Sequence, residues 1–280
     1  MSTRRRIRVL AVLCMATWLQ AAGGQNIDDS GLPSMEQIEK EISQFQEYFK
    51  HRFPDTPLRA YNNGAYSLAQ SAQRRESWKM LSVLPPYEHD MFQARALWTR
   101  KFSNGLNLDD CFGFHPPANR FPYSDQGRVI TVETAINECR TGNGENALKL
   151  SSSKLAALVA VFRESSNSEP LAVSFQDTQM RRMYARGRQE FWARRGQNNF
   201  SCASCHMENA GNRLRGDVIS AGLGHPAPFP LFSPARESSG TEDAWITLHD
   251  QYAACFVRSG AAPPPAQSLL YTALEVYQAI

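Results

Sequence analysis

The sequence predicts a mainly α-helical protein built from two related units. Three observations favour this fold class. Apolar residues recur at helical spacing in several segments, and no convincing run of alternating apolar and polar residues indicates a sheet. Two segments 91 residues apart also resemble each other. The 280 residues, 42% of them hydrophobic, suffice for two modest units with packed cores.

The first expected helix begins after Ser34, where a capping box predicts its N-terminus. Gln37 follows three residues later, the spacing at which the two residues cap each other. The apolar residues that come next are spaced by 4, 3 and 4 positions, which places them on one helical face. They are Ile38, Ile42, Phe45 and Phe49.

The later elements follow from breakers and periodicity. The segment 53–67 is expected to be a loop, and residues 89–105 are expected to form a helix that Gly105 ends. The Pro- and Gly-rich segment 224–240 is also expected to be a loop. The remaining helices are expected over 128–141, 146–165, 176–195, 243–255 and 266–280.

Residues 1–24 have the pattern of a secretory signal peptide. Four arginines precede an apolar run, and small residues follow. We therefore expect export to the periplasm, by either the general or the twin-arginine route, and no later segment is long and apolar enough to span a membrane. Without these arginines, 26 Lys and Arg remain against 27 Asp and Glu, so the net charge of +3 does not indicate a nucleic-acid partner.

The two similar segments indicate an internal repeat. Residues 94–115 and 185–206 share six identities in 22 positions, and both are expected to run as helix, glycine and then a cysteine motif. The identical pairs are Ala94 and Ala185, Arg95 and Arg186, Gly105 and Gly196, Asn107 and Asn198, Cys111 and Cys202, and His115 and His206. The repeat predicts two copies of one unit, with a boundary after residue 165.

The second copy ends in "CASCH", a complete haem-attachment motif. Cys202 and Cys205 are spaced to form thioethers with the two haem vinyl groups, and His206 is then carried under the iron as an axial ligand. A redox dithiol or half a zinc site is a weaker interpretation, because no second C-x-x-C motif occurs. Residues 166–280 are therefore expected to form a cytochrome c domain with one covalent haem c.

The first copy, "CFGFH" at 111–115, has Phe114 where the second motif cysteine would stand. One thioether cannot form, and a bulky phenyl group is expected to occupy its place. Residues 25–165 are therefore expected to form a cytochrome c-like domain without haem, in which His115 binds no iron.

The second axial ligand can be sought by elimination. No methionine follows Met207 and no lysine follows the motif, which leaves His225, His249 and Cys255. We favour Cys255, because an unpaired cysteine in an exported protein indicates a specific use of its thiol. A thiolate ligand would stabilise ferric iron and place a nucleophilic sulfur at the haem face.

These features together resemble the SoxA family, the catalytic haem subunits of the SoxAX cytochromes of bacterial thiosulfate oxidation. The resemblance is carried by "NFSCASCH", "GNRLRG", "LHDQYAAC" and "PPAQSLLYTALEVY", and it is strongest over 184–277. It implies two cytochrome c-like domains and an active haem bound by His206 and Cys255. It also implies a disulfide between Cys111 and Cys139 where the second haem has been lost. Such a closed loop contributes about 3 to 4 kcal/mol in the chain-entropy model.

The resemblance further implies a haem-dependent L-cysteine S-thiosulfotransferase. Thiosulfate would be coupled oxidatively to a cysteine of a SoxYZ-type carrier, with a SoxX-type cytochrome as heterodimer partner and Cys255 as the sulfur-bearing nucleophile. Family members commonly have an arginine four residues before this cysteine, where Gln251 stands here. Arg258 is expected to replace it, with Arg213 and Arg215 as alternatives. A periplasmic electron-transfer cytochrome without sulfur transfer is the rival function.

Overall fold

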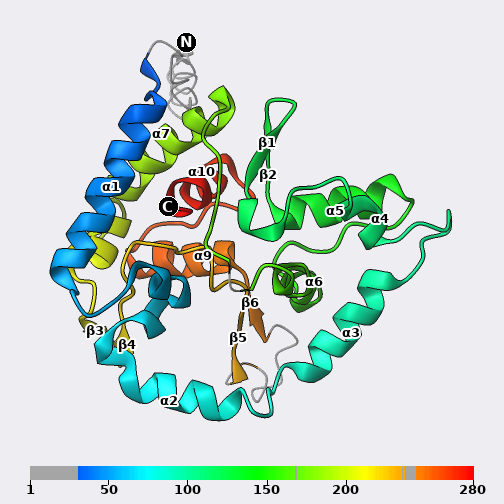
Figure 1. Cartoon of the computed structure of the whole chain (residues 1–280), viewed down its shortest axis with the longest axis horizontal. Coiled ribbons are helices and arrows are strands. Elements are labelled where there is room, and N and C mark those ends of the chain that lie inside the picture. The colour runs from blue at the N-terminus through cyan, green and yellow to red at the C-terminus, as the bar shows by residue number, and fades with distance from the viewer. Residues whose placement is uncertain (1–30, 168, 235, 237–243) are drawn as a thin grey trace, which may run out of the picture.

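A computed structural model describes residues 31–167, 169–234, 236 and 244–280. The predicted signal peptide lies outside them. The described chain is mainly helical, as the sequence predicts (Figure 1). Its α-helices are α1 (Met35–Arg52), α2 (Ala72–Leu81), α3 (Glu88–Thr99), α4 (Leu108–Phe112), α5 (Val132–Gly142), α6 (Ser153–Glu164), α7 (Thr178–Trp192), α9 (Leu248–Arg258) and α10 (Leu269–Gln278).

The described strands are short and pair only as antiparallel two-stranded ribbons. These are β1 (Tyr123–Asp125) with β2 (Arg128–Ile130), β3 (Arg213–Leu214) with β4 (Asp217–Val218), and β5 (Leu231–Phe232) with β6 (Trp245–Ile246). None of the described helices combines the length and apolar character that crossing a bilayer would require.

The start of α1 confirms the predicted capping box. The backbone N–H of Gln37 donates to Ser34 Oγ at 3.2 Å, and the backbone N–H of Ser34 donates to Gln37 Oε1 at 2.7 Å. Ile38, Phe45 and Phe49 are buried, so the predicted apolar face is the one that packs inward. This capping satisfies backbone donors that the first helical turn cannot pair internally.

Several boundaries differ from the sequence-based prediction. The expected loop at 53–67 contains a 3₁₀ helix, Leu58–Ser67, and α2 was not predicted. The helix α3 ends at Thr99, well before Gly105, which instead adopts a φ of +86° in a later turn. Residues 128–130 form β2, and α9 begins only at Leu248, because 245–246 pair with β5.

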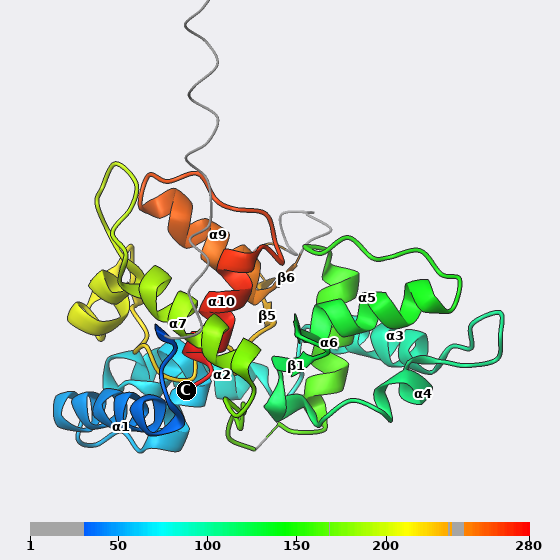
Figure 2. The ribbon, with the colours of Figure 1, turned by 90° about the horizontal axis from the view of Figure 1, so that it is seen from above.

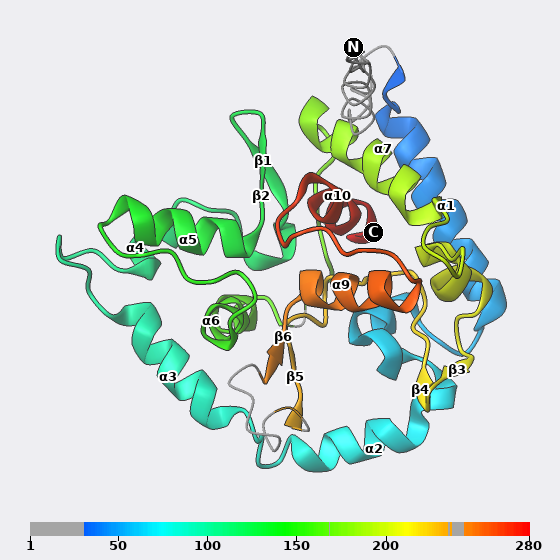
Figure 3. The ribbon, with the colours of Figure 1, turned by 180° about the vertical axis from the view of Figure 1, so that it is seen from behind.

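The buried apolar residues form two clusters. One combines residues of α1, α7, α9 and α10, and the other combines residues of α3, α4, α5 and α6 with Trp245. Seen from above, the helices α3 to α6 gather on one side of the molecule and α1, α7, α9 and α10 on the other (Figure 2). Helices α2 and α3 run along one edge in both the front and the back view (Figures 1 and 3). Although α1 comes first in sequence, it packs with the C-terminal helices.

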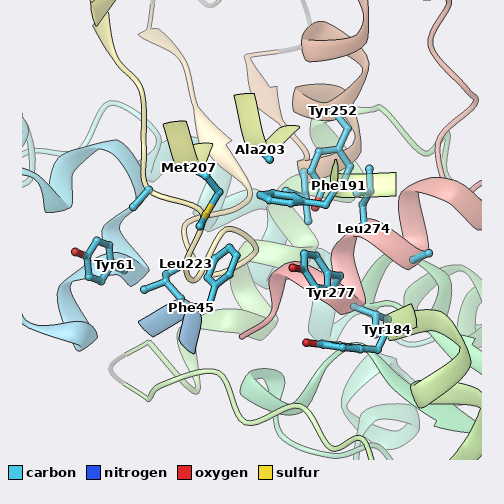
Figure 4. Packing of buried hydrophobic residues seen from close by; sticks show 14 of the residues in the cluster. Phe45, Tyr61, Tyr184, Phe191, Ala203, Met207, Leu223, Tyr252, Leu274 and Tyr277 are labelled. Carbon is cyan, nitrogen blue, oxygen red and sulfur yellow. The ribbon is translucent and has the colours of Figure 1, made fainter. Parts of the chain in front are cut away.

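Close packing of α7 against α10 fixes the helix that leads into the haem motif. A Cβ atom at Gly187 of α7 would lie 2.0 Å from the carbonyl oxygen of Ala273 in α10, so only glycine permits this approach. Around the crossing, the rings of Phe45, Phe191 and Tyr277 meet at centroid distances of 5.3 to 6.4 Å (Figure 4). This aromatic packing holds the C-terminal end of α7 in place.

Candidate functional site

The haem motif follows a tight turn after α7. Arg195 and Phe200 pair across this turn in both directions, at 2.9 and 3.2 Å. Gly196 has a φ of +69°, and a Cβ atom there would lie 2.1 Å from the carbonyl oxygen of Ser259. Glycine is therefore required twice over, by the backbone conformation and by the close contact. The chain then becomes helical at Cys202 and continues as a π-helical turn, Ser204–Glu208.

This turn is bonded directly to the end of α9. The backbone N–H of Asn198 donates to the carbonyl oxygen of Ser259 at 3.0 Å. The side-chain amide of Asn198 donates to the carbonyl oxygen of Arg258 at 2.9 Å. The backbone N–H of Gln197 donates to Gly260 at 3.3 Å. These bonds bring the haem motif to the helix that carries Cys255, although 49 residues separate His206 from Cys255 in the sequence.

One ring nitrogen of His206 is fixed by a hydrogen bond. Its Nδ1–H donates to the carbonyl oxygen of Ser220 at 3.0 Å, because a carbonyl oxygen can only accept. The lone pair is then on Nε2, for which the described part of the chain supplies no hydrogen-bond partner. Burial lowers the pKa of His206, which favours the neutral, ligating form of the imidazole.

Three unpaired cysteines lie at the site. Cys202, Cys205 and Cys255 are all half-buried and free. Burial raises the pKa of the Cys202 thiol to about 12, and the charges of Cys255 and Cys205 add to this effect. The hydrogen bonds of residues 197 and 198 with the end of α9 bring the segment that carries Cys202 and Cys205 to the helix that carries Cys255.

Cys255 lies between two polar side chains on one face of α9. Arg258 Nη1 is 3.7 Å from Cys255 Sγ, and Gln251 Nε2 is 3.9 Å from the same atom. The spacing explains the contact, since residues three and four apart share a helix face. Burial raises the pKa of the Cys255 thiol, and the charge and hydrogen bond of Arg258 oppose it. Arg258 is exposed, so its guanidinium is open to an incoming anion.

The two histidines that could have competed with Cys255 are occupied elsewhere. The ring of His225 meets that of His206 edge to face at 4.3 Å, and its Nε2 lies 3.1 Å from Ser220 Oγ. His249 Nδ1 accepts from the backbone N–H of Gln267 at 2.9 Å. Its Nε2 lies 3.2 Å from Glu275 Oε2, an ion-pair distance although the two are not aligned as a hydrogen bond. His225 thus lies on the Ser220 side of His206, and His249 Nε2 faces the Glu275 carboxylate.

Two buried donors near these cysteines are unpaired among the described residues. They are Arg195 Nη1 and the hydroxyl of Tyr271. The guanidinium of Arg195 lies over the ring of Phe256 at 4.6 Å, and its charge opposes the rise in the pKa of Cys202. Tyr271 is fully buried. Unsatisfied buried donors are rare in folded proteins, and here they fit a bound group that brings acceptors of its own. The carboxylates of a haem are such acceptors. The residues present therefore fit a haem.

The first motif is built differently. Cys111 and Cys139 form the disulfide that the family resemblance implied, with their Cα atoms 6.0 Å apart. His115 Nδ1 is bonded to the hydroxyl of Tyr123 at 2.6 Å. The prediction that the Phe114 ring fills the place of the missing thioether is wrong, because this ring is 93% exposed. Trp98, Phe112 and Phe162 pack together instead, at centroid distances of 4.5 to 5.8 Å.

The double variant Cys111→Ser/Cys139→Ser should lower the free energy of unfolding by about 3 to 4 kcal/mol, because the open chain regains loop entropy. Denaturant unfolding of the oxidised wild type and of the variant measures this difference. Reduction of the wild type should reproduce the loss. Equal stability of variant and wild type would contradict a stabilising role for the disulfide.

Comparison with known proteins gives the family. No protein-family model matches the chain. The L-cysteine S-thiosulfotransferase subunit SoxA of Chlorobaculum thiosulfatiphilum is 37% identical over 246 residues, covering 87% of this chain and 83% of that protein. The SoxA subunit of Allochromatium vinosum is 34% identical over 246 residues, covering 85% and 84%. The chain belongs to the SoxA family. The crystal structure of SoxXA from P. pantotrophus shares the fold, with a TM-score of 0.60 and 22% identity over 70% of this chain and 74% of that one.

One group of supporting hydrogen bonds has no sequence signal. Arg52 at the end of α1 donates to the carbonyl oxygens of Met207, Glu208 and Ala210 at 2.8 to 3.0 Å. Tyr48 also donates to Met207 at 3.0 Å. A guanidinium satisfies the unpaired carbonyl groups at the end of the motif helix. Because this clamp joins segments about 155 residues apart, no local pattern reveals it.

Proposed function

We propose that this protein is the haem-dependent L-cysteine S-thiosulfotransferase subunit of a SoxAX-type complex, which couples thiosulfate oxidatively to a cysteine of a SoxYZ-type carrier. The named relatives support the activity. The observation that carries the proposal for this chain is the contact of Arg258 with the free thiol of Cys255. A thiol beside an exposed guanidinium combines a sulfur nucleophile with a binding group for a dianion.

The proposed cofactor is one haem c, attached through Cys202 and Cys205. His206 would be one axial ligand and Cys255 the other. The bound haem would supply a one-electron acceptor that takes electrons from the sulfur chemistry. Arg195 and Tyr271 would donate to its carboxylates, which is supported by their unpaired donors at this place.

The proposed reaction uses Cys255 twice. Thiosulfate is held at Arg258, and its terminal sulfur bonds to Cys255 Sγ. Cys255 reacts as the thiolate, and two electrons leave the site for the haem and the SoxX-type partner, giving Cys255–S–S–SO₃⁻. The carrier thiolate then attacks the sulfur next to Cys255 Sγ. This exchange forms carrier–S–S–SO₃⁻ and releases Cys255 as a thiolate.

Residues 25–165 and 166–280 are proposed to be two cytochrome c-like domains related by a repeat, the first without haem. The two similar segments support this division, since Gly105 and Gly196 both have a left-handed φ, of +86° and +69°. The hydrogen bond of His115 to Tyr123 and the aromatic packing around Phe112 support the absence of haem from the first domain.

The partners are proposed from the same family relation. A SoxX-type cytochrome would accept the electrons as heterodimer partner, which is supported by the SoxXA complex that shares the fold. The SoxYZ-type carrier would be the protein substrate. Binding of both partners would take place in the periplasm, after export directed by residues 1–24.

Intact mass spectrometry of the mature protein should show one covalently bound haem, because only one motif has two cysteines. Cys205→Ser should still carry haem through one thioether, while Cys202→Ser/Cys205→Ser should carry none. Two haems per chain would overturn the proposed loss of the first site. Turnover of thiosulfate with the carrier and a SoxX-type partner tests the activity itself, and a protein that only shuttles electrons would show none.

A further inference from the structure

A chain of hydrogen bonds starts at His206 Nδ1 and becomes fully buried beyond His225. Ser220 Oγ lies 3.2 Å from His206 Nδ1 and 3.1 Å from His225 Nε2. On the other side of the ring, His225 Nδ1 lies 2.6 Å from Gln278 Nε2. The hydroxyl of Tyr252 donates to Gln278 Oε1 in turn. Gln278 is 2% exposed, Tyr252 6% and His225 8%, so water does not compete for the bonds of Gln278 with His225 and Tyr252.

The proton positions in this network follow from its ends. An amide Nε2 can only donate, so Gln278 donates to His225 Nδ1. The ring proton of His225 is then on Nε2 and points to Ser220 Oγ. Ser220 thereby turns acceptor lone pairs toward His206, whose Nδ1–H faces both the carbonyl oxygen and the hydroxyl of Ser220. The arrangement assigns one tautomer to each of the two histidines.

The network connects the haem motif with the helices α9 and α10. Tyr252 belongs to α9, three residues before Cys255, and it points into the buried cluster shown in Figure 4. Gln278 belongs to α10. The edge-to-face contact of the His206 and His225 rings at 4.3 Å also fixes the plane of the His206 ring. The proposed reaction does not use His225.

We propose that His225 is a positioning residue, which holds the protonated Nδ1 and the ring plane of His206 through Ser220 and ties both to α9 through Gln278 and Tyr252. This inference rests on the proposed ligation of haem by His206. Partners of a ligand's second nitrogen fix its tautomer and make it a stronger donor. A stronger donor stabilises ferric iron, so the network should keep the reduction potential low.

His225→Phe tests the proposal in the full-length holoprotein. The phenyl ring keeps the volume and the contact with His206 but removes both hydrogen bonds, so Ser220 loses the donor that aligns it. The ferric-to-ferrous ratio at a fixed potential should fall about tenfold, which is 59 mV upward for one electron. Redox titration followed by haem absorption measures this shift. The low-spin ferric electron paramagnetic resonance signal should broaden, because the ligand plane is less fixed.

His225→Gln keeps an amide donor near Ser220 and should return the potential toward that of the wild type. Ser220→Ala retains the backbone carbonyl and should shift the potential in the same direction by a smaller amount. His115→Phe is the matched control, since it removes a histidine bonded to a hydroxyl in the other half of the molecule. It should leave the potential unchanged.

An unchanged potential and ferric signal in both His225→Phe and Ser220→Ala, with haem content intact, would overturn the proposal. So would an equal shift in His115→Phe, since that would reflect general destabilisation. If the wild type itself carried no histidine-ligated haem, the proposed function would fail first, and its absorption spectrum would reveal this before any variant is made.

Discussion

Cys255→Ala is expected to abolish the coupling of thiosulfate to the carrier while leaving haem attachment intact. The proposed thioethers involve Cys202 and Cys205 only, so the haem content should equal that of the wild type. Without the sulfur of Cys255 there is no atom to which the terminal sulfur of thiosulfate can bond. Loss of a covalent nucleophile costs many orders of magnitude in related chemistry, and we expect the rate to fall by roughly a thousandfold or more.

The ligand field of the iron should change in the same variant. A thiolate ligand gives a low-spin ferric spectrum with thiolate character and a haem that mild donors reduce poorly. Cys255→Ala should lose both properties. If its spectrum remained that of the wild type, Cys255 would not be the ligand, and the proposed mechanism would lose its main support. His225 and His249 are poor substitutes, because Ser220 and Glu275 already engage them.

Cys255→Met separates the enzyme from a simple electron carrier. A thioether can restore six-coordination and should raise the reduction potential, because it brings no negative charge to the iron. A thioether cannot form the Cys–S–S–SO₃⁻ intermediate, so the variant should stay inactive in coupling. If the protein were only an electron-transfer cytochrome, Cys255→Met should still transfer electrons, because an electron carrier should tolerate a methionine ligand. Carrier modification followed by mass spectrometry and redox titration on one preparation distinguish the two.

Local sequence signals predicted the elements that depend on local chemistry. The cap of α1 by Ser34 and Gln37 was confirmed because side chain and backbone of the same turn form it. The helix α2 escaped prediction because none of its residues is buried, so it has no apolar face to produce a period. The start of α9 was placed too early, although Thr247 and Asp250 have the spacing of a capping box.

Contacts between distant segments were beyond local reasoning. The disulfide of Cys111 with Cys139 was predicted from the family resemblance, because spacing alone cannot choose among three cysteines. The network around His225 joins residues up to 72 positions apart in the sequence, from His206 to Gln278. Neither its members nor the clamp by Arg52 has a motif. In each case the partner is chosen by the packing of helices, which a short window of sequence does not contain.

The role of Arg258 can be tested by moving its guanidinium to position 251, the other position whose side chain approaches Cys255 Sγ. Arg258 and Gln251 approach the same sulfur, at 3.7 and 3.9 Å, from the two neighbouring turns of α9. Arg258→Gln should therefore lower kcat/KM for thiosulfate about ten- to a hundredfold, because the dianion loses its guanidinium partner. Most of the loss should be in KM, since the exposed guanidinium binds the substrate before the sulfur reacts.

Gln251→Arg in the Arg258→Gln background moves the guanidinium to the other side chain that approaches Cys255 Sγ. It should recover most of the lost kcat/KM, since either position can reach Cys255 Sγ along the same helix face. The two changes share one partner and should therefore be strongly non-additive in a double-mutant cycle. Arg213→Gln is the control, because the Arg213 guanidinium donates to the carbonyl oxygens of Gln70 and Gly216 in the β3–β4 region. If Arg213→Gln lost activity while Arg258→Gln kept it, the substrate would be held by the β3–β4 turn, and the contact of Arg258 with Cys255 would serve only the packing of α9.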